Sequence, residues 1–83
     1  MSINISDTAE KVTTIIAEKL HKEAGDVTND STLQDLGADS LDMVEIIMKL
    51  EEDLSVEISD EKAEQLFTVG EVIAYVHQLR RKE

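Results

Sequence analysis

The sequence predicts an all-α fold, a small four-helix bundle with three longer helices, one short third helix and a long loop between helices one and two. Three observations support this prediction. Apolar residues recur at intervals of three and four, no segment alternates as a β-strand does, and capping residues precede several apolar runs. Because the chain has 83 residues and no cysteine, we expect residues 1–83 to form one domain with a modest core and no disulfide.

The first helix is predicted to start at Asp7, with Glu10 three residues later completing a capping box. It is expected to end near His21-Lys22, because cations suit a helix C-terminus. The apolar positions of this segment follow the helical period: Ala9, Val12, Ile16 and Leu20.

A loop rich in Asp, Asn, Ser and Thr is predicted from Gly25 to Ala38, with Leu33 and Leu36 anchoring it in the core. The second helix is expected to run from Ser40 to Leu54.

The third helix is expected to be short, capped by Ser59 and reaching Leu66. Thr68 and Glu71 form a second capping box at the start of the fourth helix. The apolar residues of this last helix again keep the helical period: Val69, Val72, Ile73, Val76 and Leu79.

The second helix carries two apolar stripes. At about 100° per residue, one arc should face the core: Met43, Ile46, Ile47, Leu50 and Leu54. The other apolar positions form a separate lobe: Leu41, Val44 and Met48. Glu51 separates this lobe from the core arc, and Glu45 and Glu52 border it. Two interpretations stay open: the lobe packs on the loop or the third helix, or it is an exposed docking patch with an acidic rim.

Negative charge is concentrated in the same part of the chain. Between Asp39 and Glu64 there are ten acidic side chains and two lysines, which leaves −8 of the total net charge of −11. This field repels nucleic acid and anionic membranes and favours basic partners, although a merely solvated face is the alternative. No apolar run approaches the roughly 20 residues of a membrane span. Since the first residues also lack a signal or transit pattern, we expect a cytoplasmic location.

Ser40 is the best candidate for a covalent attachment point. With Asp39 as N-cap and Gly37 in the preceding turn, Ser40 falls in the first turn of a helix, where unpaired N–H groups favour a phosphodiester. An ordinary serine at a helix start is the alternative. A serine hydrolase fits poorly, because there is no G-x-S-x-G motif and His21 and His77 lie near the ends of other helices, where we expect them to be solvated.

The run Leu36–Glu45, Leu-Gly-Ala-Asp-Ser-Leu-Asp-Met-Val-Glu, resembles the attachment-site signature of acyl carrier proteins, particularly those of dissociated (type II) fatty acid synthesis. The resemblance continues to Val76 and is weakest before Val27. An Asp-Ser-Leu core occurs in many carrier domains, but the acids that follow it here are more typical of fatty acid carriers than of peptidyl or modular polyketide carriers.

The resemblance implies that Ser40 Oγ receives 4′-phosphopantetheine from coenzyme A through a separate magnesium-dependent transferase. The thiol of this arm would carry growing acyl chains as thioesters between enzymes. The chain would be a carrier, not an enzyme, with no catalytic residue and no bound metal. As a monomer it would meet the holo-carrier synthase (phosphopantetheinyl transferase), malonyl transferase, ketosynthase, reductases, dehydratase and acyltransferases. No nucleic acid or membrane partner is implied.

Two further sets of site residues follow from the resemblance. The partner-recognition positions are acids and apolar residues on and near the second helix: Asp39, Leu41, Asp42, Val44, Glu45, Met48, Glu51, Glu52 and Asp60. The candidates for lining an acyl cavity between helices two, three and four would equally suit an ordinary core: Ile58, Ala63, Leu66, Val72 and Tyr75.

The chain departs from many relatives at a few positions. Ser59 replaces a proline, Phe67 is bulkier than is common beside the acyl cavity, and Gly70 should loosen the start of the fourth helix. The basic cluster Arg80–Lys82 is expected to favour the end of that helix or to pair with the acidic face.

The competing class is a module without a prosthetic group, such as an acidic anion mimic or a calcium sensor. The loop that begins at Asp26 does not fit an EF-hand, because Ser31 and Gly37 stand where a glycine and a glutamate are needed.

Overall fold

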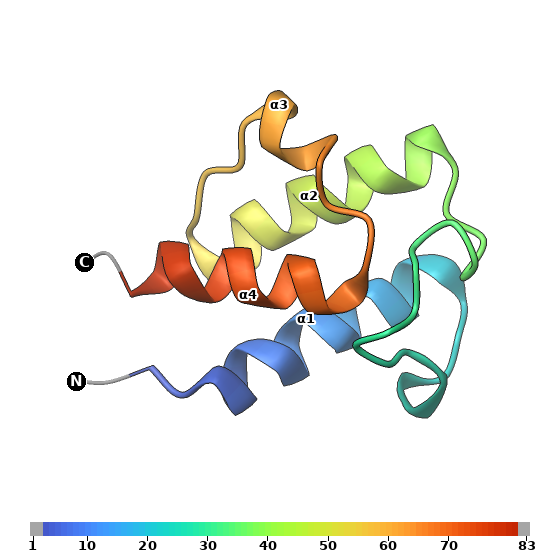
Figure 1. The fold of residues 1–83 in the computed structure, drawn as a ribbon, viewed down its shortest axis with the longest axis horizontal. Coiled ribbons are helices and arrows are strands. Elements are labelled where there is room, and N and C mark those ends of the chain that lie inside the picture. The colour runs from blue at the N-terminus through green and yellow to red at the C-terminus, as the bar shows by residue number, and fades with distance from the viewer. Residues whose placement is uncertain (1–2, 82–83) are drawn as a thin grey trace.

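The computed structural model describes residues 3–81, which form four α-helices and one 3₁₀ turn but no named strand. The elements are α1 (Ile5–Leu20), η1 (Ala24–Asp26), α2 (Ser40–Leu54), α3 (Asp60–Ala63) and α4 (Val69–Arg80). Helix α1 packs against both α2 and α4, whereas α3 is set to one side, above α2 and α4 in Figure 1. The predicted all-α fold with a short third helix is confirmed.

The N-cap of the first helix lies three residues earlier than predicted. Its N-cap is Asn4 rather than Asp7, because the Asn4 side-chain oxygen accepts the Ser6 backbone N–H at 2.8 Å. Asn and Asp cap about equally well, so residue type alone does not favour Asp7 over Asn4. The predicted end is confirmed: His21 adopts a left-handed conformation with φ 57° and closes the helix.

Apolar side chains from α1, α2 and α4 meet in one core. The largest wholly buried ones are Val12, Ile16, Ile46, Leu50, Val69, Val72 and Val76. The predicted loop anchors Leu33 and Leu36 belong to the same core. Of the five residues assigned to the core face of α2, four are buried and Met43 is half-buried.

Backbone hydrogen bonds hold the long loop against the start of α4. They join Leu33 N–H to the Phe67 carbonyl (2.9 Å), Val69 N–H to the Ser31 carbonyl (3.0 Å) and Gly70 N–H to the Asn29 carbonyl (3.0 Å). A Cβ atom at Gly70 would lie only 3.1 Å from the Asn29 carbonyl oxygen. The glycine that was expected merely to loosen α4 therefore permits a close approach of two backbones.

Helix α3 is shorter than predicted. Ser59 caps it as expected, accepting the Lys62 N–H at 3.1 Å, but the helix ends at Ala63 instead of Leu66. Beyond this point the chain continues in turns, and the Leu66 side chain is buried. Its apolar character therefore reflects an anchor in the core and not another helical turn.

The predicted capping box at the start of α4 is confirmed. Thr68 Oγ1 accepts the Glu71 N–H at 3.1 Å, and Glu71 Oε1 accepts the Thr68 N–H at 2.9 Å. The same oxygen accepts the Phe67 N–H at 3.0 Å. These two backbone N–H donors, of which that of Thr68 has the larger effect, stabilise the charged carboxylate. They therefore lower the pKa of Glu71 below its ordinary value.

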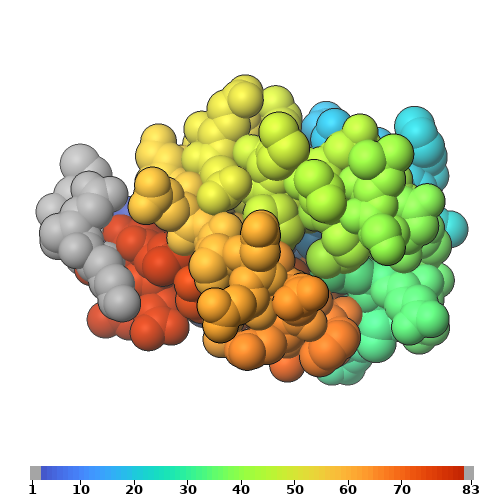
Figure 2. Space-filling model, turned by 90° about the horizontal axis from the view of Figure 1, so that it is seen from above, coloured from blue at the N-terminus to red at the C-terminus, as the bar shows by residue number. Residues whose placement is uncertain are grey.

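A groove opens between α2, α3 and the last part of the long loop. Figure 2 shows it as a hollow between the green beginning of α2 and the orange segment around α3. Its buried lining is apolar and consists of Leu33, Ile47, Ile58 and Leu66. Ser40 is among the exposed residues that line it.

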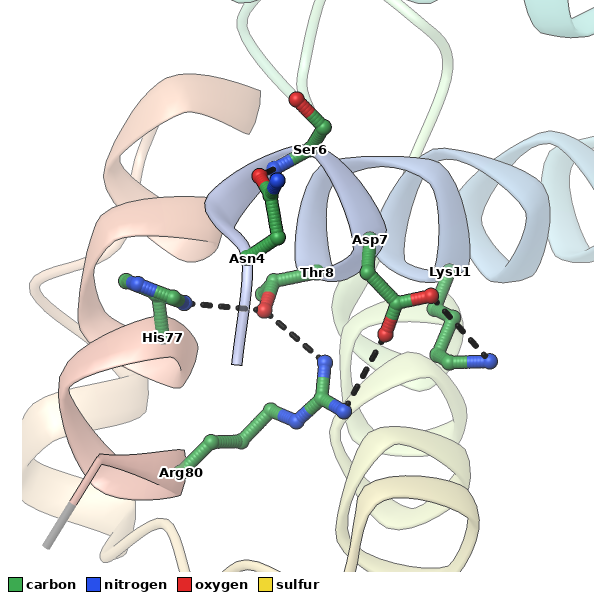
Figure 3. Close-up of polar contacts among 7 residues, drawn as sticks. All are labelled: Asn4, Ser6, Asp7, Thr8, Lys11, His77 and Arg80. Carbon is green, nitrogen blue, oxygen red and sulfur yellow. Dashed lines mark hydrogen bonds and ion pairs between the residues drawn. The ribbon is translucent and has the colours of Figure 1, made fainter. Parts of the chain in front are cut away.

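A polar cluster joins the first turn of α1 to the last turns of α4 (Figure 3). Thr8 is wholly buried; its Oγ1 accepts from Arg80 at 2.8 Å and lies 3.0 Å from His77 Nδ1. Arg80 also pairs with Asp7 at 3.2 Å. The expectation that both histidines are solvated is thus wrong for His77, which is half-buried beside Thr8, while His21 is exposed.

Arg80, the first residue of the basic cluster, does not pair with the acidic stretch. Arg80 pairs with α1, and Lys82 lies outside the described residues. Among residues 3–81, the one ion pair within the stretch 39–64 joins Lys49 to Asp53 at 3.4 Å. Most of the negative charge there has no nearby cation to offset it.

We expect Arg80→Gln to lower the free energy of unfolding by about 1–2 kcal/mol, because it removes the charged donor shared by Thr8 and Asp7. Urea denaturation would measure the loss. Arg81→Gln is the matched control: it removes the same charge from an exposed position and should cost at most about 0.5 kcal/mol. Equal losses in both variants would show that net charge, not the cluster, is responsible.

We also expect sodium chloride and millimolar magnesium to raise the melting temperature, because both reduce repulsion within the stretch 39–64. Thermal melts at increasing concentrations would measure the effect. A melting temperature that responds to neither salt would mean that the acidic stretch is already compensated within the fold.

Candidate functional site

Ser40 is the first residue of α2, and the backbone around it is fixed by a capping box. As predicted, Asp39 is the N-cap: its Oδ1 accepts the Asp42 N–H at 2.8 Å. In return, Asp42 Oδ2 accepts the Asp39 N–H at 3.2 Å. The helix start, and with it the backbone of Ser40, is therefore held in one place.

The turn before this cap is also defined by hydrogen bonds. Gly37 adopts φ +95°, a conformation that favours glycine, and its N–H donates to the Gln34 carbonyl at 2.9 Å. The Ala38 N–H donates to the Leu33 carbonyl at 3.0 Å. Since Leu33 is a buried anchor, this bond connects the approach to Ser40 directly to the core.

The chemistry available at Ser40 is that of an acceptor rather than of a catalytic nucleophile. Within residues 3–81, no hydrogen bond reaches its hydroxyl, and both histidines lie on other elements. The N–H groups of Ser40 and Leu41 have no hydrogen-bond acceptor in the same part of the chain. An exposed hydroxyl beside two such donors, at the positive end of a helix, suits a phosphate-linked group.

The second apolar lobe of α2 lies on the surface. Leu41 is 66% exposed, Val44 53% and Met48 61%. Val44 and Met48 also line the groove. The lobe therefore does not pack away against the loop or α3, which was the first of the two interpretations.

The acids predicted for partner recognition divide into two groups. Asp39 and Asp42 form the capping box, and Glu51 Oε2 accepts the Ile58 N–H at 2.9 Å. The others are exposed, with no ion pair or hydrogen bond from their side chains within residues 3–81: Glu45, Glu52 and Asp60. Glu45 and Glu52 are seven residues apart and so share one side of α2.

Three of the five predicted cavity residues line the groove, namely Ile58, Ala63 and Leu66. Val72 does not, because it is wholly buried in the core. Tyr75 is half-buried beneath Lys62, whose Nζ lies 4.8 Å from the ring centroid. Helix α4 packs on α1, so its residues do not reach the groove side of α2.

The prediction also missed part of the groove. Met43 and Ile47 were assigned only to the core face of α2, and the loop contributes Leu33. The sequence showed that these three residues are apolar. The helical period could not show that a groove opens beside them on one side of the core. Phe67, which was expected beside the acyl cavity but was not among the lining candidates, lines the groove as well.

Within residues 3–81, no three His, Asp or Glu side chains are grouped so that they could hold a metal ion. None of the helices in that range is long and apolar enough to cross a membrane.

Comparison with known proteins relates this geometry to a family. The sequence model of the phosphopantetheine attachment site matches residues 10–76. The acyl carrier protein of Enterococcus faecalis is similar in structure, with a TM-score of 0.78 and 35% identity over 93% of this chain and 99% of that one. The acyl carrier protein of Thermotoga maritima gives 0.77 and 27%, covering 90% and 88%.

A third similar structure is the HMG-ACPI domain from the CurA module of Lyngbya majuscula, with a TM-score of 0.83, 25% identity, and coverage of 95% of this chain and 81% of that one.

The family's attachment site takes covalently bound 4′-phosphopantetheine, and the exposed hydroxyl at the start of α2 fits such a group. The chain therefore belongs to the phosphopantetheine attachment-site family, among its acyl carrier proteins.

Proposed function

We propose that this chain is the acyl carrier of a dissociated fatty acid synthesis system and that Ser40 bears its 4′-phosphopantetheine. The observation that carries the proposal is the exposed Ser40 hydroxyl, which lies at a rigidly capped helix start and lines an apolar groove. When bound, the group supplies a thiol that carries acyl chains as thioesters. Residues 1–83 act as a single carrier domain and a monomer, located in the cytoplasm.

The residues around Ser40 bind and orient the arm. The N–H groups of Ser40 and Leu41 would be available to the phosphate of the arm, and the capping box keeps the carboxylates of Asp39 and Asp42 turned to the backbone. The groove between α2 and α3 then receives the acyl chain, with Ile58, Ala63 and Leu66 among its walls. Val72 and Tyr75 support that wall from the core rather than touching the chain.

Partners dock on the exposed lobe of α2. Leu41, Val44 and Met48 form its apolar centre, and Glu45 and Glu52 form an acidic rim that attracts Arg and Lys patches. The proposed partners are the phosphopantetheinyl transferase, malonyl transferase, ketosynthase, reductases, dehydratase and acyltransferases. The chain itself serves them as a substrate and has no catalytic residue of its own.

Ser40→Ala should prevent attachment of the arm and leave the fold intact, because the lost hydroxyl is exposed and makes no hydrogen bond within residues 3–81. Intact mass after incubation with coenzyme A and a transferase would show the arm or its absence, and circular dichroism would show the fold. Ser6→Ala is the matched control, since Ser6 is another exposed serine in the first turn of a helix. An arm on the Ser40→Ala variant would refute the site.

The acidic residues at the rim of the lobe should affect the rate of association with a partner, whereas its apolar contact residues should affect the rate of dissociation. Glu45→Gln or Glu52→Gln should slow association with a ketosynthase and flatten its salt dependence, whereas Glu18→Gln, exposed on α1, should not. Met48→Ala should speed dissociation and cost about 1 kcal/mol or more of binding. Stopped-flow kinetics would separate the two effects. If Met48→Ala leaves binding unchanged and lowers the melting temperature by several degrees, the docking role is wrong.

A further inference from the structure

Phe67 is an exposed aromatic residue on a fixed backbone. Its side chain is 65% exposed, although it is the only phenylalanine in the chain. The Phe67 N–H donates to Glu71 Oε1 at 3.0 Å, and the Phe67 carbonyl accepts the Leu33 N–H at 2.9 Å. The Phe67 backbone is therefore fixed by hydrogen bonds at both its N–H and its carbonyl, while its ring is exposed to solvent. Packing in the core does not explain an aromatic residue at this position.

Hydrogen bonds place this ring near the attachment site. The Phe67 carbonyl is bonded to Leu33, and the Leu33 carbonyl is bonded to Ala38, two residues before Ser40. Backbones joined in this way lie about 5 Å apart, so the Phe67 backbone is roughly 10 Å from that of Ala38. Phe67 and Ser40 line the same groove.

The position of the groove determines which kind of ligand is best placed to contact the Phe67 ring. Ser40 lines the groove, and the buried part of the lining is apolar, so a group tethered to Ser40 experiences it at a high effective concentration. A free partner has no such advantage. On the opposite side of the groove, Val44 and Met48 of α2 add further apolar surface.

We propose that Phe67 is a specificity-determining residue of this carrier: its ring is the wall against which the first carbons of a medium-length acyl chain, carried on the Ser40 arm, rest. The proposal rests on the proposed function, since it requires the arm at Ser40. An aromatic contact of this kind should favour the sheltered over the solvated chain by roughly threefold to tenfold. A two-carbon acyl group is too short to reach this wall and the apolar lining together.

The test compares Phe67→Thr with Ile5→Thr, which changes another exposed apolar residue, 51% exposed on α1 and outside the groove. Each protein is loaded with octanoyl- or acetyl-phosphopantetheine by a transferase, and intact mass confirms the loading. Because a sheltered chain binds only the folded state, octanoylation should raise the melting temperature of the wild type and of Ile5→Thr. The rise should be at least halved in Phe67→Thr, and acetylation should have no such effect.

A second measurement uses Phe67→Trp as a reporter, since the chain has no tryptophan. The indole emission should shift to shorter wavelength in the octanoyl form and not in the acetyl form.

The possible outcomes are distinct. If the wild type gains no arm, the proposed function fails, and this inference fails with it. If the arm attaches but Phe67→Thr keeps the full octanoyl rise and the indole emission does not move, only the role of Phe67 is overturned. Slower association of Phe67→Thr with a ketosynthase, with the octanoyl rise unchanged, would make the ring a partner contact and likewise overturn the proposal.

Discussion

The backbone hydrogen bonds between the long loop and the start of α4 determine where Ser40 lies. Without them, the stretch between α1 and α2 would connect to the core only through its apolar anchors. With them, Leu33 is tied to Phe67 and, through its own carbonyl, to Ala38, so that the turn before Ser40, the loop side of the groove and the N-terminus of α4 are joined. Gly70 is the position that makes this possible, because a side chain there would crowd Asn29.

The fold separates a stable scaffold from a weakly held wall. Helix α1 packs on both α2 and α4, and its N-terminal turn is secured by the Asn4 cap and by the Arg80 cluster. Helix α3 is a single turn whose attachments are local: the Ser59 cap, the Lys62 cation over Tyr75, and the buried residues on either side of it. Segments with so few buried contacts open at lower free energy than the core does. The groove is therefore bounded on one side by the element that costs least to displace.

Local chemistry explains which features the sequence could predict. The caps at Asp39, Ser59 and Thr68 depend on residues three positions apart, and all three were predicted correctly. The errors arose where local signals compete or where packing decides. Asn4 and Asp7 were both acceptable caps, and Leu66 fitted the helical period although it anchors a turn. The groove is a tertiary feature: no local pattern shows that α4 turns Val72 toward the core and leaves Ile47 beside an opening.

The acidic surface is chemically less uniform than its sequence suggests. Asp39 and Asp42 accept backbone N–H groups at the start of α2, and Glu51 accepts that of Ile58 beyond its end. Removing any of these carboxylates changes the fold as well as the charge, since a backbone donor loses its acceptor. Among the described residues, the carboxylates of Glu45 and Glu52 accept no backbone N–H and form no ion pair, so their charge is available to a partner without structural cost. The proposed attachment point and the proposed docking side thus lie on one helix but depend on different residues.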